Sequence, residues 1–410
     1  MSSSFVAGLD IGSQSVKAVV GEIGRGGSFR VIEVLKFPSA GIRKGVVQDV
    51  SEVTQSLSPA IAAMKKIGKA ASANIFLGLA SSDLKVQQSL GVVAVSRADF
   101  EIYQDDVNRA IQSAQAVNLA PNRMVLHSIV REYIVDGVRD IRDPLEMTGN
   151  RLEVSSLIID AFAPSVKNLT KCVEILGGGV GGIILGPLAN ARAVLTKNQR
   201  ELGVVVVDIG FGKTSMCVYE EGKLLHAAVF PVGSGHATND LAIGLKVPTE
   251  TAEVVKLSFG SAIAREVAVR EAIELTKIDG RSRGTVQRRF IAEIIEVRLA
   301  EIFELVNNEL KYIGKSAKLP GGIVLVGGGA KLPGIVDLAK QELKLSAQIG
   351  IPETHGFELG SPEIGIKLED PEFTCALGLM LWGYDKSTES ATIQFQMKGL
   401  LSKMFRYFAP

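Results

Sequence analysis

The sequence has few cysteines and almost no net charge. Its 410 residues include three cysteines, and 45 basic and 44 acidic side chains leave a formal net charge of +1. Cys172, Cys217 and Cys375 lie far apart in apolar runs, so we expect three buried thiols in a reducing compartment and no disulfide framework. The balanced charge gives no general reason to expect nucleic-acid binding. Any functional charge must be local.

Long hydrophobic runs are also missing. The N-terminus enters an apolar strand without a basic leader and an uninterrupted apolar core, so we do not expect a secretion signal. The richest apolar stretch, Leu176 to Leu195, is interrupted by Pro187, Asn190 and Arg192. It therefore lacks the ~20 consecutive apolar residues that a membrane-spanning helix requires. We expect a soluble body of two or three domains.

Strand-like runs of Val, Ile and Leu alternate with helical patterns, which predicts an α/β chain. The triplet Asp10-Ile11-Gly12, which is followed by a strand, recurs 198 positions later as Asp208-Ile209-Gly210. Such a repeat predicts two similar lobes. The clearest strands are expected at Phe5 to Leu9, Val16 to Glu22, Gly203 to Val207, Ser215 to Tyr219 and Gly322 to Val326, and the clearest helices at Ser51 to Lys66, Gln104 to Val117 and Gln287 to Ile313.

The first copy of the repeat predicts a phosphate-binding turn between two strands. Successive backbone N–H groups of such a turn can hold phosphate oxygens, and the glycine lets the backbone approach closely. The expected ligating residues are Gly12, Ser13, Gln14, Ser15 and Lys17, with Asp10 placed to hold Mg²⁺ through water. A single loop of this kind is also typical of a plain β-hairpin with a glycine turn.

A second turn and a third glycine-rich segment strengthen this interpretation. Two opposed turns can hold one polyphosphate between the lobes, and a glycine turn after a buried strand can lie flat against an adenosine. The second turn contributes Gly210, Phe211, Gly212, Lys213 and Thr214 with Asp208 as a further metal-facing acid, and the third segment contributes Gly327, Gly328, Gly329, Ala330 and Pro333. Alone, the third segment also suits an ordinary strand-to-helix turn.

In this order and at these spacings, the three segments resemble the phosphate-1, phosphate-2 and adenosine motifs of the actin, sugar-kinase and chaperone ATPase superfamily. The resemblance implies a two-lobed α/β fold with ATP and Mg²⁺ in the central cleft. Glu253 and Lys256 resemble the superfamily's further nucleotide-contacting helix, although their spacing also suits an exposed i,i+3 charge pair.

Two positions depart from the superfamily pattern. Relatives commonly carry a catalytic carboxylate before the proline that matches Pro187, where this chain has Gly186. We therefore expect slow or absent hydrolysis, because phosphoryl transfer depends on positioning as well as charge. The segment Phe211-Gly212-Lys213 also replaces a common Gly-Gly-Thr run, which leaves the geometry at the terminal phosphate open.

Several segments resemble the bacterial division family FtsA over essentially the whole chain. They are Ser39 to Val47, Val125-Leu126-His127, Arg200 to Gly203 and Gln287 to Arg298. The resemblance implies that one lobe receives the acidic C-terminal peptide of FtsZ, and the positions that match its basic residues are Arg288 and Arg298. An arginine fork suits carboxylate recognition. Exposed arginines on an amphipathic helix are the ordinary alternative.

The resemblance and the composition together predict the organisation of the chain, including an inserted α+β subdomain between the parts of the first lobe and a Ser- and Thr-rich linker near the end. The expected parts are subdomain 1A at residues 1–83 and 162–196, inserted subdomain 1C at 84–161, subdomain 2A at 197–230 and 305–369, subdomain 2B at 231–304, a helix returning to 1A at 370–384, a flexible linker at 385–395 and an amphipathic helix at 396–410.

The terminal segment predicts a membrane-binding helix. Its apolar residues recur at helical spacing, its charged residues are all basic, and no acid interrupts it. The apolar stripe consists of Met397, Leu400, Leu401, Met404, Phe405 and Phe408, and the basic residues are Lys398, Lys403 and Arg406. Docking on the protein's own body is the alternative. Because so short a helix is marginal alone, several anchors on one polymer should bind more tightly than one.

These features predict an ATP-binding division protein that polymerises on the inner face of the cytoplasmic membrane. There it would anchor FtsZ, recruit later division proteins and act as a weak or inactive ATPase. A small-molecule kinase of the superfamily and a pilus-assembly adaptor resembling PilM are the alternatives. Against the kinase, this chain has no acid or base at the expected cleft position. Against the adaptor, the PilM family lacks the basic tail that this chain carries.

Overall fold

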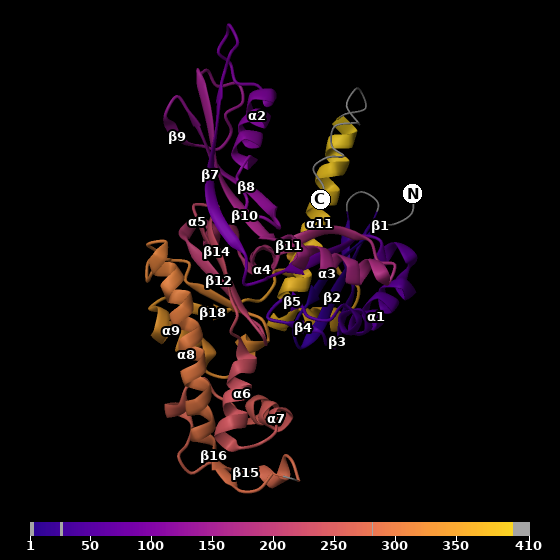
Figure 1. Cartoon of the computed structure of the whole chain (residues 1–410), viewed down its shortest axis with the longest axis vertical. Helices are drawn as coiled ribbons and strands as arrows, with labels where there is room; N and C mark the ends of the chain where they lie inside the picture. The colour runs from indigo at the N-terminus through magenta and orange to yellow at the C-terminus, as the bar shows by residue number, and fades with distance from the viewer. Residues whose placement is uncertain (1–3, 25–27, 281, 397–410) are drawn as a thin grey trace.

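The computed structural model describes residues 4–24, 28–280 and 282–396. Two lobes lie side by side, the inserted subdomain extends from one end, and a helical subdomain extends from the other (Figure 1). The predicted membrane-binding residues from Met397 to Phe408 lie outside the described residues. No helix in the described part of the chain is both long enough and apolar enough to cross a membrane.

The first lobe is built on a six-stranded sheet in the order β11-β6-β1-β2-β3-β19. Antiparallel pairing joins β1 to β2 and β2 to β3, whereas β6 and β11 are parallel to β1. The strands are β1 (Ser4–Ile11), β2 (Ser15–Ile23), β3 (Phe29–Pro38), β6 (Ile75–Leu79), β11 (Val180–Leu185) and β19 (Glu358–Leu359), and β4 (Ile42–Arg43) with β5 (Val46–Val47) forms a separate small pair.

The second lobe repeats this arrangement, as the recurring triplet predicts. Its five-stranded sheet has the order β14-β13-β12-β17-β18, with an antiparallel β12-β13-β14 meander and parallel β17 and β18. Valines occupy the first four positions of β12 and are buried, as expected of a central strand. The strands are β12 (Val204–Ile209), β13 (Thr214–Glu220), β14 (Lys223–Phe230), β17 (Ile323–Val326) and β18 (Ala347–Ile349).

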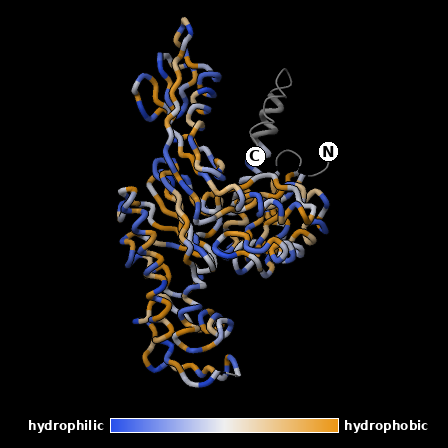
Figure 2. The backbone as a smooth tube through the Cα atoms, in the orientation of Figure 1, coloured by the Kyte–Doolittle hydropathy of each residue, from blue (hydrophilic) through white to orange (hydrophobic). Residues whose placement is uncertain are grey.

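Helices cover both sheets. In α1, Asp49 caps the first turn by accepting hydrogen bonds from the N–H groups of Ser51 and Glu52, and an apolar stripe from Val53 to Met64 faces the first sheet. Figure 2 shows hydrophobic positions running through both lobes. The helices of the two lobes are α1 (Val50–Ile67), α3 (Ala163–Ile175), α4 (Gly186–Val194), α5 (Lys197–Leu202), α9 (Ile335–Leu343), α10 (Pro362–Leu368) and α11 (Thr374–Gln396).

Each lobe carries one further subdomain. In the inserted subdomain, α2 packs on a separate four-stranded sheet in the order β7-β10-β8-β9. The subdomain attached to the second lobe consists of α6, α7 and α8 with the small β15-β16 pair. The elements are β7 (Lys85–Ala94), α2 (Gln104–Gln115), β8 (Arg123–Val135), β9 (Val138–Ile141), β10 (Arg151–Phe162), α6 (Ser234–Leu245), α7 (Thr249–Phe259), β15 (Ala272–Glu274), β16 (Thr285–Gln287) and α8 (Arg288–Tyr312).

The expected flexible linker at residues 385–395 is wrong, because α11 continues through Gln396. The hydroxyls of Ser387 and Thr388 donate hydrogen bonds to the carbonyls of Gly383 and Tyr384, one turn earlier. Ser and Thr that bond back in this way are accommodated within a helix. The segment also lacks Gly and Pro, the residues that most strongly end helices. All three cysteines are free and buried, as predicted.

His127 ties the inserted subdomain to the first lobe. Its Nε2 accepts a hydrogen bond of 3.0 Å from the backbone N–H of Leu185, so this nitrogen must be unprotonated. Burial lowers the pKa of His127 to about 4, well below its ordinary value of 6.5. Protonation would charge a buried ring and break the link between β8 and β11.

We therefore predict that acid weakens the fold through His127. A histidine with a depressed folded pKa contributes stability that is fully present above the unfolded pKa and is lost as the pH falls from 6.5 toward 4. Between pH 7 and pH 5 the loss should reach about 2 kcal/mol in wild type. In His127→Gln, which keeps an acceptor but does not titrate, urea unfolding should show a smaller loss over this interval. An equal loss in both proteins would contradict the assignment.

Candidate nucleotide-binding site

The two predicted phosphate turns have the same backbone geometry. In the first, Asp10 pairs with Lys17 across the hairpin, and the N–H of Gly12 donates to the carbonyl of Ser15 at 3.0 Å. In the second, Asp208 pairs with Ser215, and the N–H of Gly210 donates to the carbonyl of Lys213, also at 3.0 Å. The turns therefore present equivalent backbone groups from opposite lobes. A cavity of about 630 Å³, within the usual size range for ligand pockets, lies between them.

Contacts between the lobes narrow this cavity. The side chain of Gln14 donates to Glu253 at 3.3 Å, and the ammonium of Lys213 donates to the carbonyl of Ala80 at 2.8 Å. A Cβ at Gly212 would lie 2.7 Å from the Ser13 hydroxyl and 3.2 Å from its Cβ, so a side chain here would require Ser13 to move. The second turn is also held from behind, where the N–H of Gly235 donates to the carbonyl of Phe211.

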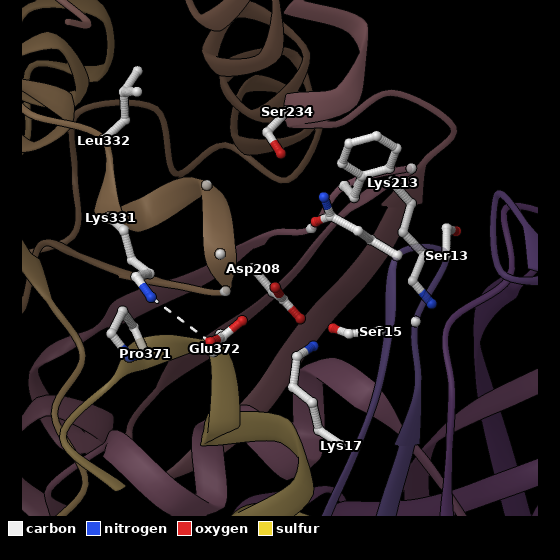
Figure 3. A pocket seen from close by; sticks show the side chains of 18 of the residues that line it. Ser13, Ser15, Lys17, Asp208, Lys213, Ser234, Lys331, Leu332, Pro371 and Glu372 are labelled. Carbon is white, nitrogen blue, oxygen red and sulfur yellow. Dashed lines mark ion pairs between the residues drawn. The ribbon is translucent and has the colours of Figure 1, made fainter. Parts of the chain in front are cut away.

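Asp10, Asp208, Lys17 and Lys213 all line the cavity, and Figure 3 labels Asp208 and the two lysines. Lys17 lies 3.3 Å from a carboxylate oxygen of Asp10. Burial disfavours its charged form, but Asp10, Asp208 and Glu372 outweigh this effect and raise the pKa of Lys17. Burial, followed by the charge of Asp10, raises the pKa of Asp208, and the hydrogen bond from Asn190 and the charges of Lys17 and Lys213 oppose the rise. Each acid thus has a positively charged neighbour.

The second lobe and its helical subdomain contribute further residues to the cavity wall. Lys256 donates to Glu253 at 2.7 Å and to the Thr238 hydroxyl at 2.8 Å, and burial lowers the pKa of Lys256 despite Glu253. Apolar side chains and the glycine-rich third segment complete the wall, which suits the flat face of a base. These residues are Ala237, Leu257, Ile295, Leu299, Gly327, Gly328, Gly329, Leu332 and Pro333.

The structure brings the predicted site residues together with two exceptions. Thr214 and Ala330 do not line the cavity, although the sequence pattern placed them there. Thr214 begins β13 and is fully buried, and its hydroxyl has no hydrogen-bond partner among the described residues. Ala330 packs into the core of the second lobe. The residue after a phosphate turn points away from the cleft because side chains alternate along a strand.

Sequence reasoning missed residues that reach the cavity from distant segments. Asn190 comes from α4, Cys375 from the first turn of α11, and Glu372 from the turn before it. Lys36 contacts Glu372 at 2.7 Å, and Lys331 lies 3.6 Å from the same carboxylate (Figure 3). This charged cluster links the first lobe to the glycine-rich segment of the second. No motif in the sequence marks these residues.

The residues present suit a hydrated Mg²⁺. Asp10 and Asp208 approach from opposite lobes, and the buried amide oxygen of Asn190 has no hydrogen-bond partner among the described residues. Oxygen atoms of this kind accept hydrogen bonds from the water shell that Mg²⁺ usually retains. The donor set therefore fits the metal that the sequence motifs imply.

A second hollow lies on the subdomain attached to the second lobe. It has a volume of about 520 Å³ and is lined by α6 and α8, with Ile243, Phe290 and Val297 exposed beside Arg298. Arg298 forms a bidentate pair with Asp240, at 2.6 and 3.1 Å, and also contacts Glu301. An adjoining hollow adds Arg283 and Arg289.

Arg288 lies outside the residues that line either hollow. Its guanidinium donates to the carbonyl of Phe259 and to Glu271, so it holds the start of α8 against the subdomain.

Solved structures define the class of the fold. A PilM-PilN type IV pilus biogenesis complex matches with a TM-score of 0.65 and 17% identity, covering 92% of this chain and 98% of that one. MreB5 of Spiroplasma citri bound to ADP matches with a TM-score of 0.54 and 13% identity, covering 97% and 99%. The chain therefore has the actin-like ATPase fold.

Sequence comparisons identify the family within this class. The model of "Cell division protein FtsA" matches residues 205–378, and that of the "SHS2 domain inserted in FTSA" matches residues 81–160. FtsA of Pseudomonas aeruginosa is 33% identical over 96% of this chain and 92% of its own length, and FtsA of Bacillus subtilis is 35% identical over 91% and 82%. The chain belongs to the FtsA family of cell division proteins.

Proposed function

We propose that this chain is an ATP- and Mg²⁺-binding division protein that polymerises on the inner face of the cytoplasmic membrane and anchors FtsZ filaments there. One observation carries the nucleotide part of the proposal. Two equivalent turns, each with a lysine and an aspartate nearby, face one cavity from opposite lobes. In a member of the FtsA family, that arrangement favours a polyphosphate ligand over a sugar or another neutral substrate.

The proposed site divides the nucleotide into three parts. Backbone N–H groups of the two turns, with Lys17 and Lys213, would hold the phosphates, and the apolar end around Leu332 would receive the base. Asp10 and Asp208 would hold Mg²⁺, which neutralises phosphate charge when bound. Because residues of both lobes contact one ligand, ATP would favour the closed arrangement of the lobes.

Gly186 supports a role for ATP in assembly more than in turnover. A Cβ at this position would meet Ala80, Leu79 and the Cys375 sulfur at 3.5 to 3.8 Å, which is ordinary contact, so close packing does not require glycine here. The chain nevertheless has no acid there to orient an attacking water. We therefore expect weak or absent ATPase activity.

The first prediction concerns Asp208. Asp208→Ala should weaken Mg²⁺-ATP binding by about tenfold or more, because a charged acceptor in the cleft is lost. Titration calorimetry with saturating Mg²⁺ measures the effect. Asp337→Ala, which removes an exposed acid from α9, should leave binding unchanged. Wild-type affinity in Asp208→Ala would place the nucleotide elsewhere.

The hollow beside Arg298 is the proposed site for the acidic C-terminal peptide of FtsZ. Ile243 and Val297 are about three-quarters exposed, at 76% and 72%, so they can bury an aliphatic side chain of a peptide. A peptide carboxylate can replace Glu301, which is half exposed, while Asp240 continues to orient the arginine fork. Arg288, whose guanidinium is used within the subdomain, would act by holding the start of α8.

Arg298→Glu should therefore reduce affinity for an FtsZ tail peptide by at least about tenfold. Fluorescence anisotropy of a labelled peptide provides the measurement. Lys277→Glu makes the same charge change on an exposed residue of the subdomain, outside both hollows, and should have little effect. Equal losses in the two variants would indicate a general charge effect and remove Arg298 from the site.

Membrane attachment rests on the sequence of the terminal segment and on family membership. The apolar stripe and purely basic charge favour an anionic lipid surface, where each cation adds about 1 kcal/mol. Polymerisation would combine several weak anchors into one firm attachment. The inserted subdomain, which extends away from both lobes, is the proposed surface for later division proteins (Figure 1).

The anchor is tested by comparing two substitutions that add the same charge. Phe405→Glu interrupts the apolar stripe and should abolish flotation with anionic liposomes, whereas Ser402→Glu lies off the stripe and should reduce flotation only partly. If Phe405→Glu floats like wild type, the terminal segment is not the membrane anchor.

A further inference from the structure

Asn190 is a buried amide at the nucleotide cavity whose oxygen has no partner. The residue is 1% exposed, and its side chain lines the cavity from α4. Its Nδ2 donates a hydrogen bond of 2.9 Å to Asp208, whereas its Oδ1 accepts none from the described residues. Buried acceptors without a partner are rare in folded proteins, and those at a ligand site indicate a bound water, ion or ligand group.

The hydrogen bond to Asp208 identifies which end of the amide is unpaired. The nitrogen of Asn190 is the atom that donates to Asp208, so the oxygen, which can only accept, is the end without a partner among the described residues. The cavity thus gains an acceptor that belongs to neither phosphate turn.

The position of Asn190 on α4 is also informative. It lies four residues after Gly186, so both positions occupy the same face of the helix, one turn apart. Gly186 offers no side chain to the cavity, and the other polar residue of α4, Arg192, is paired with Asp385 at 2.7 Å. Asn190 is therefore the polar side chain that α4 presents to the nucleotide.

We propose that Asn190 is a positioning residue whose amide oxygen accepts a hydrogen bond from a water molecule of hydrated Mg²⁺, while its nitrogen orients Asp208. This inference rests on the proposed function, because it requires Mg²⁺-ATP in the cleft. Metal-bound water is a strong donor, and Mg²⁺ keeps several waters in nucleotide sites. A neutral amide satisfies one of them without adding negative charge beside Asp10 and Asp208.

The test compares ATP affinity with saturating Mg²⁺ and with EDTA, by titration calorimetry on the full chain. In Asn190→Ala the gain in affinity that Mg²⁺ gives should fall by about three- to tenfold, the effect of one hydrogen bond, while the affinity in EDTA stays within about twofold. The proposal would be overturned if Asn190→Ala lost the same ATP affinity with Mg²⁺ as with EDTA, or if the gain in affinity from Mg²⁺ stayed at its wild-type value. A purely structural role does not alter the dependence on metal.

Asn190→Asp provides the conservative rescue. Two adjacent carboxylates share one proton, so the variant keeps a donor toward Asp208 and an oxygen acceptor toward the cavity. It should retain at least the wild-type gain from Mg²⁺. If it loses the gain as Asn190→Ala does, the acceptor oxygen is not the cause.

A crystal structure of wild type with Mg²⁺ and a non-hydrolysable ATP analogue decides the matter if Asn190→Ala fails to fold. The proposal predicts a metal-bound water within hydrogen-bond distance of Asn190 Oδ1, and a direct contact with phosphate or protein instead would overturn it. Failure of wild type to bind ATP, or to respond to Mg²⁺, would overturn the proposed function itself. Normal Mg²⁺-ATP binding with no water at Oδ1 would overturn only the role of Asn190.

Discussion

The close crossing of α11 with α4 and β1 determines how the two lobes meet. A Cβ at Gly378 of α11 would lie 1.8 Å from the carbonyl oxygen of Ala189, and one at Gly8 would lie 2.0 Å from that of Ala376. No other residue allows backbones to approach this closely. The bidentate pair of Arg192 with Asp385 joins the same two helices farther along. Because α4 also packs against β12 and β13 of the second lobe, Asn190 of α4 and Cys375 of α11 both reach the nucleotide cavity.

That geometry explains which parts of the site the sequence predicted. The repeated Asp-Ile-Gly turns are local, so the backbone pattern of Gly12 and Gly210 follows from neighbouring residues. Asn190 and Glu372 could not be found in this way, because they approach the turns only through the crossing of α4 and α11. The sequence pattern placed Thr214 at the cavity because every residue of the motif was expected to face it. Side chains alternate along β13, however, and the side chain of Thr214 is buried in the second lobe.

The same local signals predicted most of the fold. The prediction failed where other interactions outweighed a local signal. Buried Val-rich runs and the recurring triplet indicated both sheets, and the helical pattern from Gln287 to Ile313 indicated α8. The polar composition of residues 385–395 suggested a linker, but Ser387 and Thr388 bond to carbonyls of the preceding turn. Composition describes the preference of a segment in isolation. The preceding helix, anchored by its packing between the lobes, extends through these residues.

The charge balance of the cleft bears on what nucleotide binding can accomplish. Lys17 pairs with the acid of its own hairpin, whereas Lys213 occupies the turn position equivalent to Ser15 and reaches Ala80 of the other lobe. Lys213 therefore connects the two lobes, and under the proposed function it would also contact the phosphates. Under the proposed function, phosphate contact and lobe closure are therefore one event. The same α11 that forms part of the cavity continues to Gln396, immediately before the basic terminal segment. Under the proposed function, closure of the lobes and membrane attachment would therefore be connected through a single helix, as suits a protein whose ligand would control assembly more than turnover.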